Sequence, residues 1–165
     1  PVIFDGYPRT AAQAEALVAR YAAAGRRIAT AESCTGGAVA EAITAIAGSS
    51  GWFERGFVTY SNAAKIEMLG IRPATLKAFG AVSEEIAAEM AAGALARSRA
   101  AVAIAVTGIA GPGGSEFKPE GRVCFGLADA GGVRTETVDF GPLGRRAVRE
   151  ATVDHALRMV LAAVD

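Results

Sequence analysis

The six residues AVAIAV, at positions 101–106, constrain the fold of this chain more than any other stretch. The run is wholly apolar but far shorter than the roughly 20 residues that a membrane-spanning helix needs. A short apolar run of this kind is typical of a strand that is buried on both faces of a sheet. Since such a sheet needs helices on both sides, the run predicts an α/β domain.

Helix and strand patterns alternate through the first two thirds of the chain. Thr10 and Gln13 form a capping box, which predicts a first helix that ends at Gly25. Asn62 and Ser83 are suitable caps for two later helices. The predicted strands before the apolar run are 27–31 and 56–60, and the predicted helices are 37–47, 63–70 and 84–98.

The last third of the chain changes character. Strand-like stretches at 122–130 and 133–140 flank Gly131-Gly132, which is a two-residue hairpin signal, and a final helix is predicted over 145–164. This order predicts a three-layer α/β/α domain with a mixed, mostly parallel sheet and a late antiparallel hairpin. We expect residues 1–165 to form a single domain, with 1–9 as a flexible lead segment.

Charge and cysteine content exclude several classes of function. The chain has 17 basic and 17 acidic residues, so it lacks the basic excess of nucleic-acid-binding proteins. Two cysteines provide neither a disulfide framework nor a zinc site. No signal peptide is visible, and Pro1 cannot be a translational start, so we expect a processed or incomplete amino terminus. We expect a cytoplasmic homo-oligomer, a dimer or higher, that uses no cofactor and binds neither nucleic acid nor membrane.

Two glycine-containing loops follow predicted strands. ESCTGG (32–37) follows the first strand, and TGIAGPGGS (107–115) follows the apolar strand. Ligands of open α/β sheets bind at such loops, where glycines present backbone N–H groups to an anion. The helix that starts near Gly36 would add the positive end of its dipole. The alternative is that these residues are only caps and turns. Neither loop matches GxGxxG or GxxxxGK[ST], so the sequence gives little support for ATP hydrolysis or for dinucleotide binding.

Six motifs occur in an order and spacing that resemble a known family. They are TAESCTGG, GFVTYSNAAKIEMLG, GAVSEE, AVTGIAGPGGS, KPEG and GRRAVR. Over residues 10–163 the chain is similar to the carboxy-terminal domain of the competence/damage-inducible CinA family, whose enzymatic members are nicotinamide mononucleotide (NMN) deamidases. The resemblance implies a three-layer α/β fold, no metal, and hydrolysis of the NMN carboxamide to nicotinate mononucleotide and ammonia, a step of pyridine nucleotide salvage.

The chain departs from that family at two places. Residues 1–165 do not include the amino-terminal domain that the resemblance implies for longer members, where it is linked to pyrophosphatase activity. The resemblance also implies an acidic residue in many members at the position of Gly144. A second resemblance concerns residues 2–17, which are similar to the nucleotide-monophosphate-binding segment of adenylate kinases. Because the phosphate loop that precedes that segment in kinases is missing, we do not expect kinase activity.

Ser33 is the predicted nucleophile for amide hydrolysis, because a strand-to-helix turn exposes a side chain. His155 is the only histidine and sits in the last predicted helix, so it offers no clear triad. Lys65 is the best base among three lysines, and Tyr60 would orient it or relay a proton. Without the resemblance, Lys65 would more often be a solvated lysine on a helix surface. With the resemblance, a role as a catalytic base with a lowered pKa is favoured. Cys34 is the rival nucleophile.

Arg145 and Arg149 are predicted to bind the substrate phosphate, because residues four apart share a helix face. The remaining predicted substrate-binding residues lie in or beside the two loops: Thr30, Glu32, Thr35, Gly36, Asn62, Thr107, Gly108, Ala110 and Gly111. Two alternatives stay open at this point. One is a non-catalytic nucleotide-binding or regulatory domain, and the other is a module that binds recombination proteins.

Overall fold

Five strands form one mixed sheet in the described part of the computed structural model, which covers residues 6–164, with side chains from residue 12 on. The order across the sheet is β2 (Phe53–Val58), β1 (Ile28–Glu32), β3 (Val102–Gly108), β4 (Arg122–Asp129) and β5 (Gly132–Asp139). β1 pairs in parallel with β2 and β3, whereas β4 is antiparallel to both β3 and β5. Four of these strands therefore run in one direction, and β4 runs in the other.

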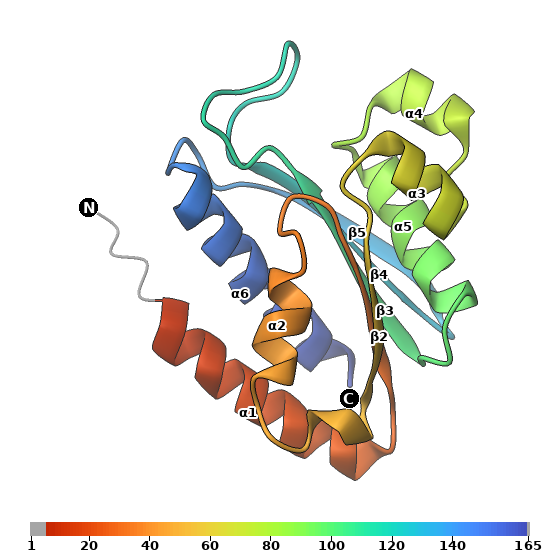
Figure 1. The fold of residues 1–165 in the computed structure, drawn as a ribbon, viewed down its shortest axis with the longest axis vertical. Helices are drawn as coiled ribbons and strands as arrows, with labels where there is room; N and C mark the ends of the chain where they lie inside the picture. The colour runs from red at the N-terminus through yellow and green to blue at the C-terminus, as the bar shows by residue number, and fades with distance from the viewer. Residues whose placement is uncertain (1–5, 165) are drawn as a thin grey trace.

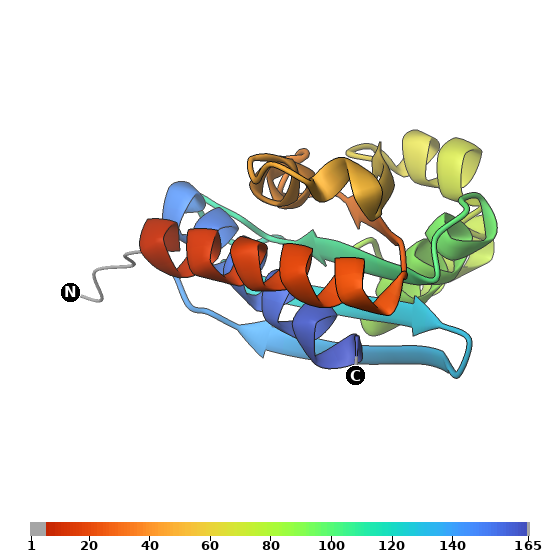
Figure 2. The same ribbon diagram turned by 90° about the horizontal axis from the view of Figure 1, so that it is seen from below.

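Helices cover both faces of the sheet, as Figures 1 and 2 show. One face carries α1 (Gly6–Ala24), α2 (Ala38–Thr44) and α6 (Arg145–Ala163). The other carries α3 (Asn62–Leu69), α4 (Pro73–Phe79) and α5 (Glu84–Ala96). The predicted three-layer α/β/α architecture with a late hairpin is confirmed. No helix within residues 6–164 combines the length and apolar character that crossing a membrane requires.

The alternation inside AVAIAV explains how the two cores differ. Val102, Ile104 and Val106 belong to the larger core, between the sheet and α1, α2 and α6. Ala103 and Ala105 belong to the second core, under α5. Small side chains there let helices approach closely: a Cβ on Gly93 of α5 would lie 2.2 Å from the carbonyl oxygen of Leu69. The apolar strand is thus buried on both faces, as predicted.

Several predicted boundaries were wrong. β2 covers Phe53–Val58 instead of 56–60, because its register follows β1, from Ile28 opposite Phe53 to Glu32 opposite Val58. α2 is shorter than 37–47, and α4 was not predicted. The first helix begins at Gly6, so Thr10 is not its cap, and part of the predicted lead segment is helical. Residues 2–5 of the kinase-like stretch lie outside the described residues, and the rest of it belongs to α1.

Two local assignments are also corrected. Ser61, not Asn62, caps α3: the backbone of Ser61 is extended, and its hydroxyl accepts a hydrogen bond from the Ala64 N–H at 3.0 Å. The hairpin turn lies one residue earlier than Gly131-Gly132, because Asp129 pairs with Gly132. The Asp129 carboxylate accepts the Gly131 N–H at 2.8 Å and so stabilises that turn.

Candidate active site

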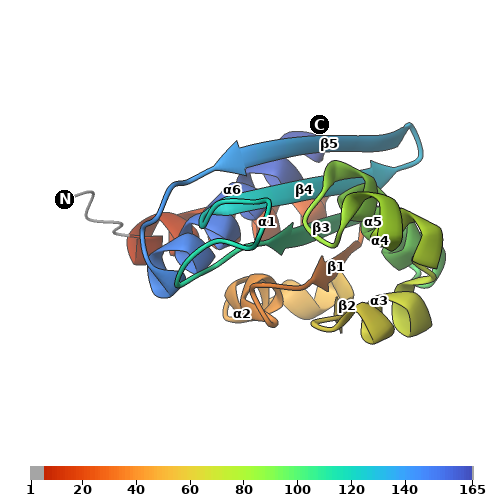
Figure 3. The same cartoon turned by 90° about the horizontal axis from the view of Figure 1, so that it is seen from above.

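The two glycine-containing loops meet because β1 and β3 are parallel neighbours. Glu32 lies opposite Val106 in the sheet, and the Ser33 N–H continues the pairing by donating to the Val106 carbonyl at 3.1 Å. Both loops therefore leave the sheet at the same edge, which Figure 3 views from above. A pocket of about 390 Å³ opens there, lined by Ser33, Cys34, Tyr60, Asn62, Lys65, Ala81, Val82, Arg145 and residues 107–115.

Lys65 reaches the pocket from the first turns of α3. Its side chain is one of the largest fully buried ones, with 1% of the residue exposed. The ammonium nitrogen Nζ donates to Ser33 Oγ at 3.1 Å, to the Thr59 carbonyl at 2.9 Å and to the Tyr60 carbonyl at 3.2 Å. Burial lowers the pKa of Lys65 from its ordinary value, against a smaller opposing electrostatic effect of Cys34. The Lys65 amine thus combines a lowered pKa with a direct contact to the Ser33 hydroxyl.

Cys34, the rival candidate nucleophile, differs from Ser33 in its surroundings. The residue is 6% exposed, and burial raises the pKa of its thiol to about 11. At neutral pH the thiol therefore stays protonated and unreactive. Ser33 is also nearly buried, but its hydroxyl contacts the Lys65 amine directly. Of the two neighbouring side chains, the Ser33 hydroxyl is therefore the one that the structure places in hydrogen-bond contact with Lys65.

Glu32 belongs to the scaffold of the nucleophile turn, contrary to the predicted substrate contact. One carboxylate oxygen accepts the Thr35 hydroxyl at 2.5 Å and the Val39 N–H at 2.8 Å, and the other accepts the Ala40 N–H at 3.1 Å. This carboxylate occupies the amino terminus of α2, so the helix dipole that we expected to attract a substrate anion is already compensated within the chain.

Three neighbours of Glu32 are likewise outside the pocket lining. Thr30 is fully buried inside β1, and its hydroxyl faces β2, where a Cβ on Gly56 would come within 2.7 Å of it. Thr35 is buried and held by Glu32. Gly36 lies beside the Arg149 guanidinium. The structure therefore does not place these three residues at the predicted substrate contact.

Arg145 and Arg149 do not converge on one point. Arg145 lines the pocket, where Nη1 donates to the Gly111 carbonyl at 2.7 Å and Nη2 donates to the Tyr60 hydroxyl at 2.9 Å. Arg149 instead donates to the Cys34 carbonyl at 3.2 Å and to the Thr35 carbonyl at 3.0 Å. Arg145 thus lines the pocket, while Arg149 holds the turn at residues 34–35.

The Tyr60 hydroxyl points to Arg145 and not to Lys65. The side chain is 61% exposed, and only the backbone carbonyl of Tyr60 contacts the Lys65 amine. A direct proton relay through this hydroxyl, which we expected, is therefore not what the geometry offers. Tyr60 instead forms the rim of the pocket together with Arg145.

The other predicted pocket residues lie where the sequence placed them: Asn62, Thr107, Gly108, Ala110 and Gly111 all line the cavity. The wall formed by Ala81 and Val82 was missed, although it belongs to the motif GAVSEE. His155 is outside the lining; its ring packs on Phe125 at 4.5 Å and contacts Glu136. In the described residues, no group of three or more His, Cys, Asp or Glu could hold a metal ion.

Comparisons with known proteins agree with this architecture. The family model for the CinA C-terminal domain matches residues 10–164. The nicotinamide-nucleotide amidohydrolase PncC of Escherichia coli strain K12 is 54% identical over 145 residues, which cover 87% of this chain and 86% of that protein. A CinA-like protein of Chlorobium phaeobacteroides is 55% identical over 141 residues and 82% of this chain, but the match spans only 34% of its own length.

Solved structures give the same result. The competence/damage-inducible protein CihA of Agrobacterium tumefaciens superimposes with a TM-score of 0.91 at 49% identity, and the match covers 93% of this chain and 94% of that one. A competence or damage-inducible protein of Enterobacter asburiae gives a TM-score of 0.90 at 36% identity, with coverage of 94% and 98%.

Proposed function

This chain belongs to the CinA C-terminal domain family, and we propose that it hydrolyses the carboxamide of NMN to nicotinate mononucleotide and ammonia. The observation that carries the proposal is the buried Lys65 amine, 3.1 Å from the Ser33 hydroxyl, at the base of a pocket of about 390 Å³. The name of the similar E. coli protein, a nicotinamide-nucleotide amidohydrolase, supports the choice of substrate.

The first step is acylation of Ser33. In the neutral amine, two N–H groups of Lys65 remain on the Thr59 and Tyr60 carbonyls, and the lone pair faces Ser33 Oγ. Lys65 takes the hydroxyl proton as Oγ attacks the carboxamide carbon, and peptide N–H groups of the pocket loops stabilise the oxyanion. The Lys65 ammonium then returns the proton to the leaving nitrogen, so ammonia departs and a nicotinoyl ester remains on Ser33.

The second step is hydrolysis of that ester. Lys65, neutral again, takes a proton from a water molecule, whose oxygen attacks the ester carbon. Collapse of the tetrahedral intermediate breaks the bond to Oγ, and the proton returns to Ser33. Nicotinate mononucleotide leaves as the second product. Proton transfer in both steps requires a lysine that loses its proton near neutral pH, which the burial of Lys65 supports.

Arg145 is the proposed partner of the substrate phosphate. Its guanidinium lies at the rim of the pocket, whereas Lys65 lies at the base, so a mononucleotide can place its amide and its phosphate at opposite ends. Charge-assisted contacts of this kind contribute about 1.5–3 kcal/mol each. The proposal also includes a cytoplasmic location and assembly into a homo-oligomer of two or more chains.

Ammonia release from NMN, compared with release from free nicotinamide, tests the proposal. We expect the parent protein to release ammonia from NMN and Ser33→Ala to release none while it still binds NMN. Cys34→Ala is the matched control at the adjacent position and should remain active, because its thiol is protonated. NMN binding without any ammonia release by the parent protein would instead indicate a non-catalytic nucleotide-binding domain.

A further inference from the structure

Residues 118–120 connect the two sides of the pocket. Lys118 Nζ donates to the Phe79 carbonyl at 2.7 Å and also to the Val82 carbonyl, and thereby holds the wall at 79–82. The Ser115 N–H donates to the Lys118 carbonyl at 2.9 Å, which closes the loop upon itself. Two residues after Lys118, on the opposite side, Glu120 makes the contacts that concern Arg145.

Both carboxylate oxygens of Glu120 are engaged by backbone donors from different segments. Oε1 accepts the Gly113 N–H at 2.5 Å, and Oε2 accepts the Gly144 N–H at 3.0 Å. The side chain lies directly against Gly111, where a Cβ would come within 2.6 Å of the Glu120 carboxyl carbon. Gly111 also has a φ of +96°, which side chains other than glycine rarely adopt. The glycine-rich loop is therefore shaped around this carboxylate.

The same carboxylate completes the amino terminus of α6. Gly144 is the N-cap residue of this 19-residue helix and provides no side chain for capping. An acidic group near a helix amino terminus is stabilised by the unpaired N–H groups and by the helix dipole. The Gly144 N–H, at the N-cap position of α6, is one of the two backbone donors to Glu120. Glu120 supplies a carboxylate to that position from a remote part of the chain.

Arg145 is held between the two segments that Glu120 joins. It follows Gly144 in the chain, and its Nη1 donates to the carbonyl of Gly111, two residues before Gly113. One carboxylate thus fixes both the backbone that carries the arginine and the loop that receives it. We propose that Glu120 is a positioning residue that holds Arg145 in place for the phosphate of the substrate. This inference rests on the proposed function, because it assigns Arg145 to that phosphate.

The direction in which Glu120→Gln changes the affinity for NMN distinguishes a positioning role of Glu120 from a purely electrostatic one. Glu120→Gln removes a negative charge close to the phosphate site, and this alone would strengthen the binding of an anion. Glutamine, however, offers one oxygen and one NH₂ group, so it can accept only one of the two backbone N–H groups. If Glu120 positions Arg145, the variant must bind NMN more weakly in spite of its more favourable charge.

The test measures equilibrium binding of NMN and of nicotinamide riboside, which lacks the phosphate, to proteins that carry Ser33→Ala and so cannot consume the ligand. We expect Glu120→Gln to raise the Kd for NMN on the order of tenfold and to leave the Kd for the riboside unchanged. With Arg145→Ala already present, Glu120→Gln should cause no further loss. Equal losses for both ligands, or a full additional loss beside Arg145→Ala, would overturn the inference.

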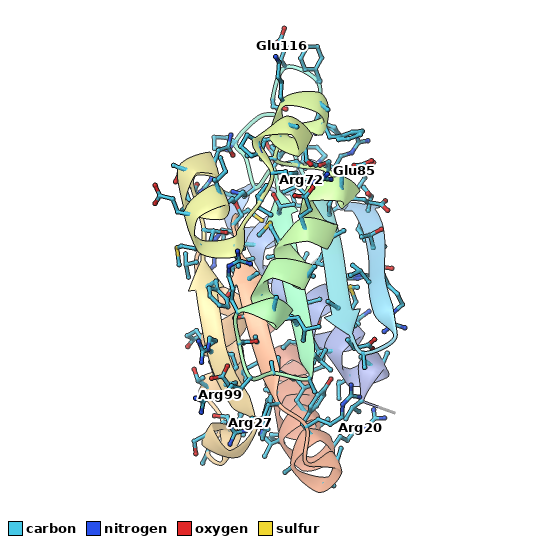
Figure 4. The ribbon with its side chains drawn as sticks, turned by 90° about the vertical axis from the view of Figure 1, so that its right-hand side faces the viewer. Arg20, Arg27, Arg72, Glu85, Arg99 and Glu116 are labelled. Carbon is cyan, nitrogen blue, oxygen red and sulfur yellow. The ribbon has the colours of Figure 1, made fainter. Side chains whose placement is uncertain are left out.

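Glu116→Gln is the matched control, with the same change of charge in the same loop. Glu116 is exposed and lies at the far tip of the molecule in Figure 4, so its variant should bind both ligands as the parent does. If Glu120→Gln does not fold, as judged by thermal unfolding, Glu120→Asp replaces it. Aspartate keeps both oxygens, but it is one methylene shorter and cannot reach both N–H groups, so the same selective loss for NMN is expected.

The binding measurements on the Glu120 and Arg145 variants and the ammonia assay test different proposals, and either proposal can be refuted without the other. A parent protein that releases ammonia from NMN but shows no coupling between Glu120 and Arg145 would refute the positioning role and leave the amidohydrolase. A protein that shows the coupling but releases no ammonia would refute the amidohydrolase and leave the positioning role. If the Ser33→Ala protein does not bind NMN at all, the positioning role is refuted as well.

Discussion

The buried Lys65 amine predicts that one pKa governs both the reaction rate and part of the stability of this protein. An ordinary lysine titrates near 10.4, so only about 0.1% of it is neutral at pH 7.5. Lys65 is 1% exposed, and desolvation lowers its pKa in the folded state. In the unfolded chain the side chain is hydrated and returns to its ordinary value.

The direction of the stability effect follows from proton binding. Between the lowered pKa of the folded state and about 10.4, the unfolded chain binds one proton more than the folded one, so the free energy of unfolding rises with pH. Below this window both states are protonated, and the full cost of the buried charge is present. Above it both are neutral, and the cost is gone. Each unit of pKa difference corresponds to about 1.4 kcal/mol.

Lys65→Met isolates this contribution, because methionine has a similar length and does not titrate. The difference in unfolding free energy between the parent and Lys65→Met, measured with urea from pH 6 to 9.5, should shift in favour of the parent as the pH rises. The rate of NMN hydrolysis by the parent should rise with pH through the same folded-state pKa. Lys65→Met and Lys65→Arg should each lower kcat by about 10²–10⁴-fold, since neither side chain can act as a base.

Two results would refute this reasoning. A stability difference that does not change with pH would mean that the Lys65 pKa is not shifted by burial. A Lys65→Arg protein that retains most of its turnover would mean that Lys65 is not the base. Agreement between the kinetic and the thermodynamic pKa is the strongest outcome, because the two values come from independent measurements.

Three further substitutions test other parts of the structure. Tyr60→Phe removes the acceptor of Arg145 Nη2 and should raise KM for NMN a few-fold, which corresponds to about 0.5–1.5 kcal/mol, with kcat nearly unchanged; a large fall in kcat would restore the proton relay. Arg149→Ala removes two hydrogen bonds to the nucleophile turn and should lower kcat and stability, by about 1–3 kcal/mol in thermal unfolding; an effect on KM alone would contradict the structural role. Gly93→Ala should destabilise by about 1–3 kcal/mol, because its Cβ would meet the Leu69 carbonyl; an unchanged Tm would show that α3 and α5 can separate at no cost.

The sequence could predict the fold and the proximity of Ser33 and Lys65, because both depend on local patterns. The apolar run at 101–106 predicts a sheet with helices on both faces, and the hairpin signal near 131 predicts that the sheet is mixed; neither prediction depends on knowing the other tertiary contacts. Ser33 lies at a strand-to-helix turn, and Lys65 lies in the first turn of α3, the helix that follows β2. Neighbouring parallel strands end at the same edge of a sheet, and this rule brings the two residues together across 32 positions of sequence.

Which polar groups remain free for a substrate was decided only by the tertiary structure. Glu32, Arg149 and Glu120 all resemble ligand-binding residues, since each is a charged side chain in or beside a glycine-containing loop or at a helix start. In the folded chain, Glu32 accepts N–H groups of α2, and Arg149 donates to carbonyls 114 and 115 positions away. Glu120 joins two segments that lie 7 and 24 positions from it in the sequence. A buried backbone group needs a partner at close range, so the nearest charged side chain in space takes that role. Distance in space is set by the packing of the whole domain, and no local pattern in the sequence records it.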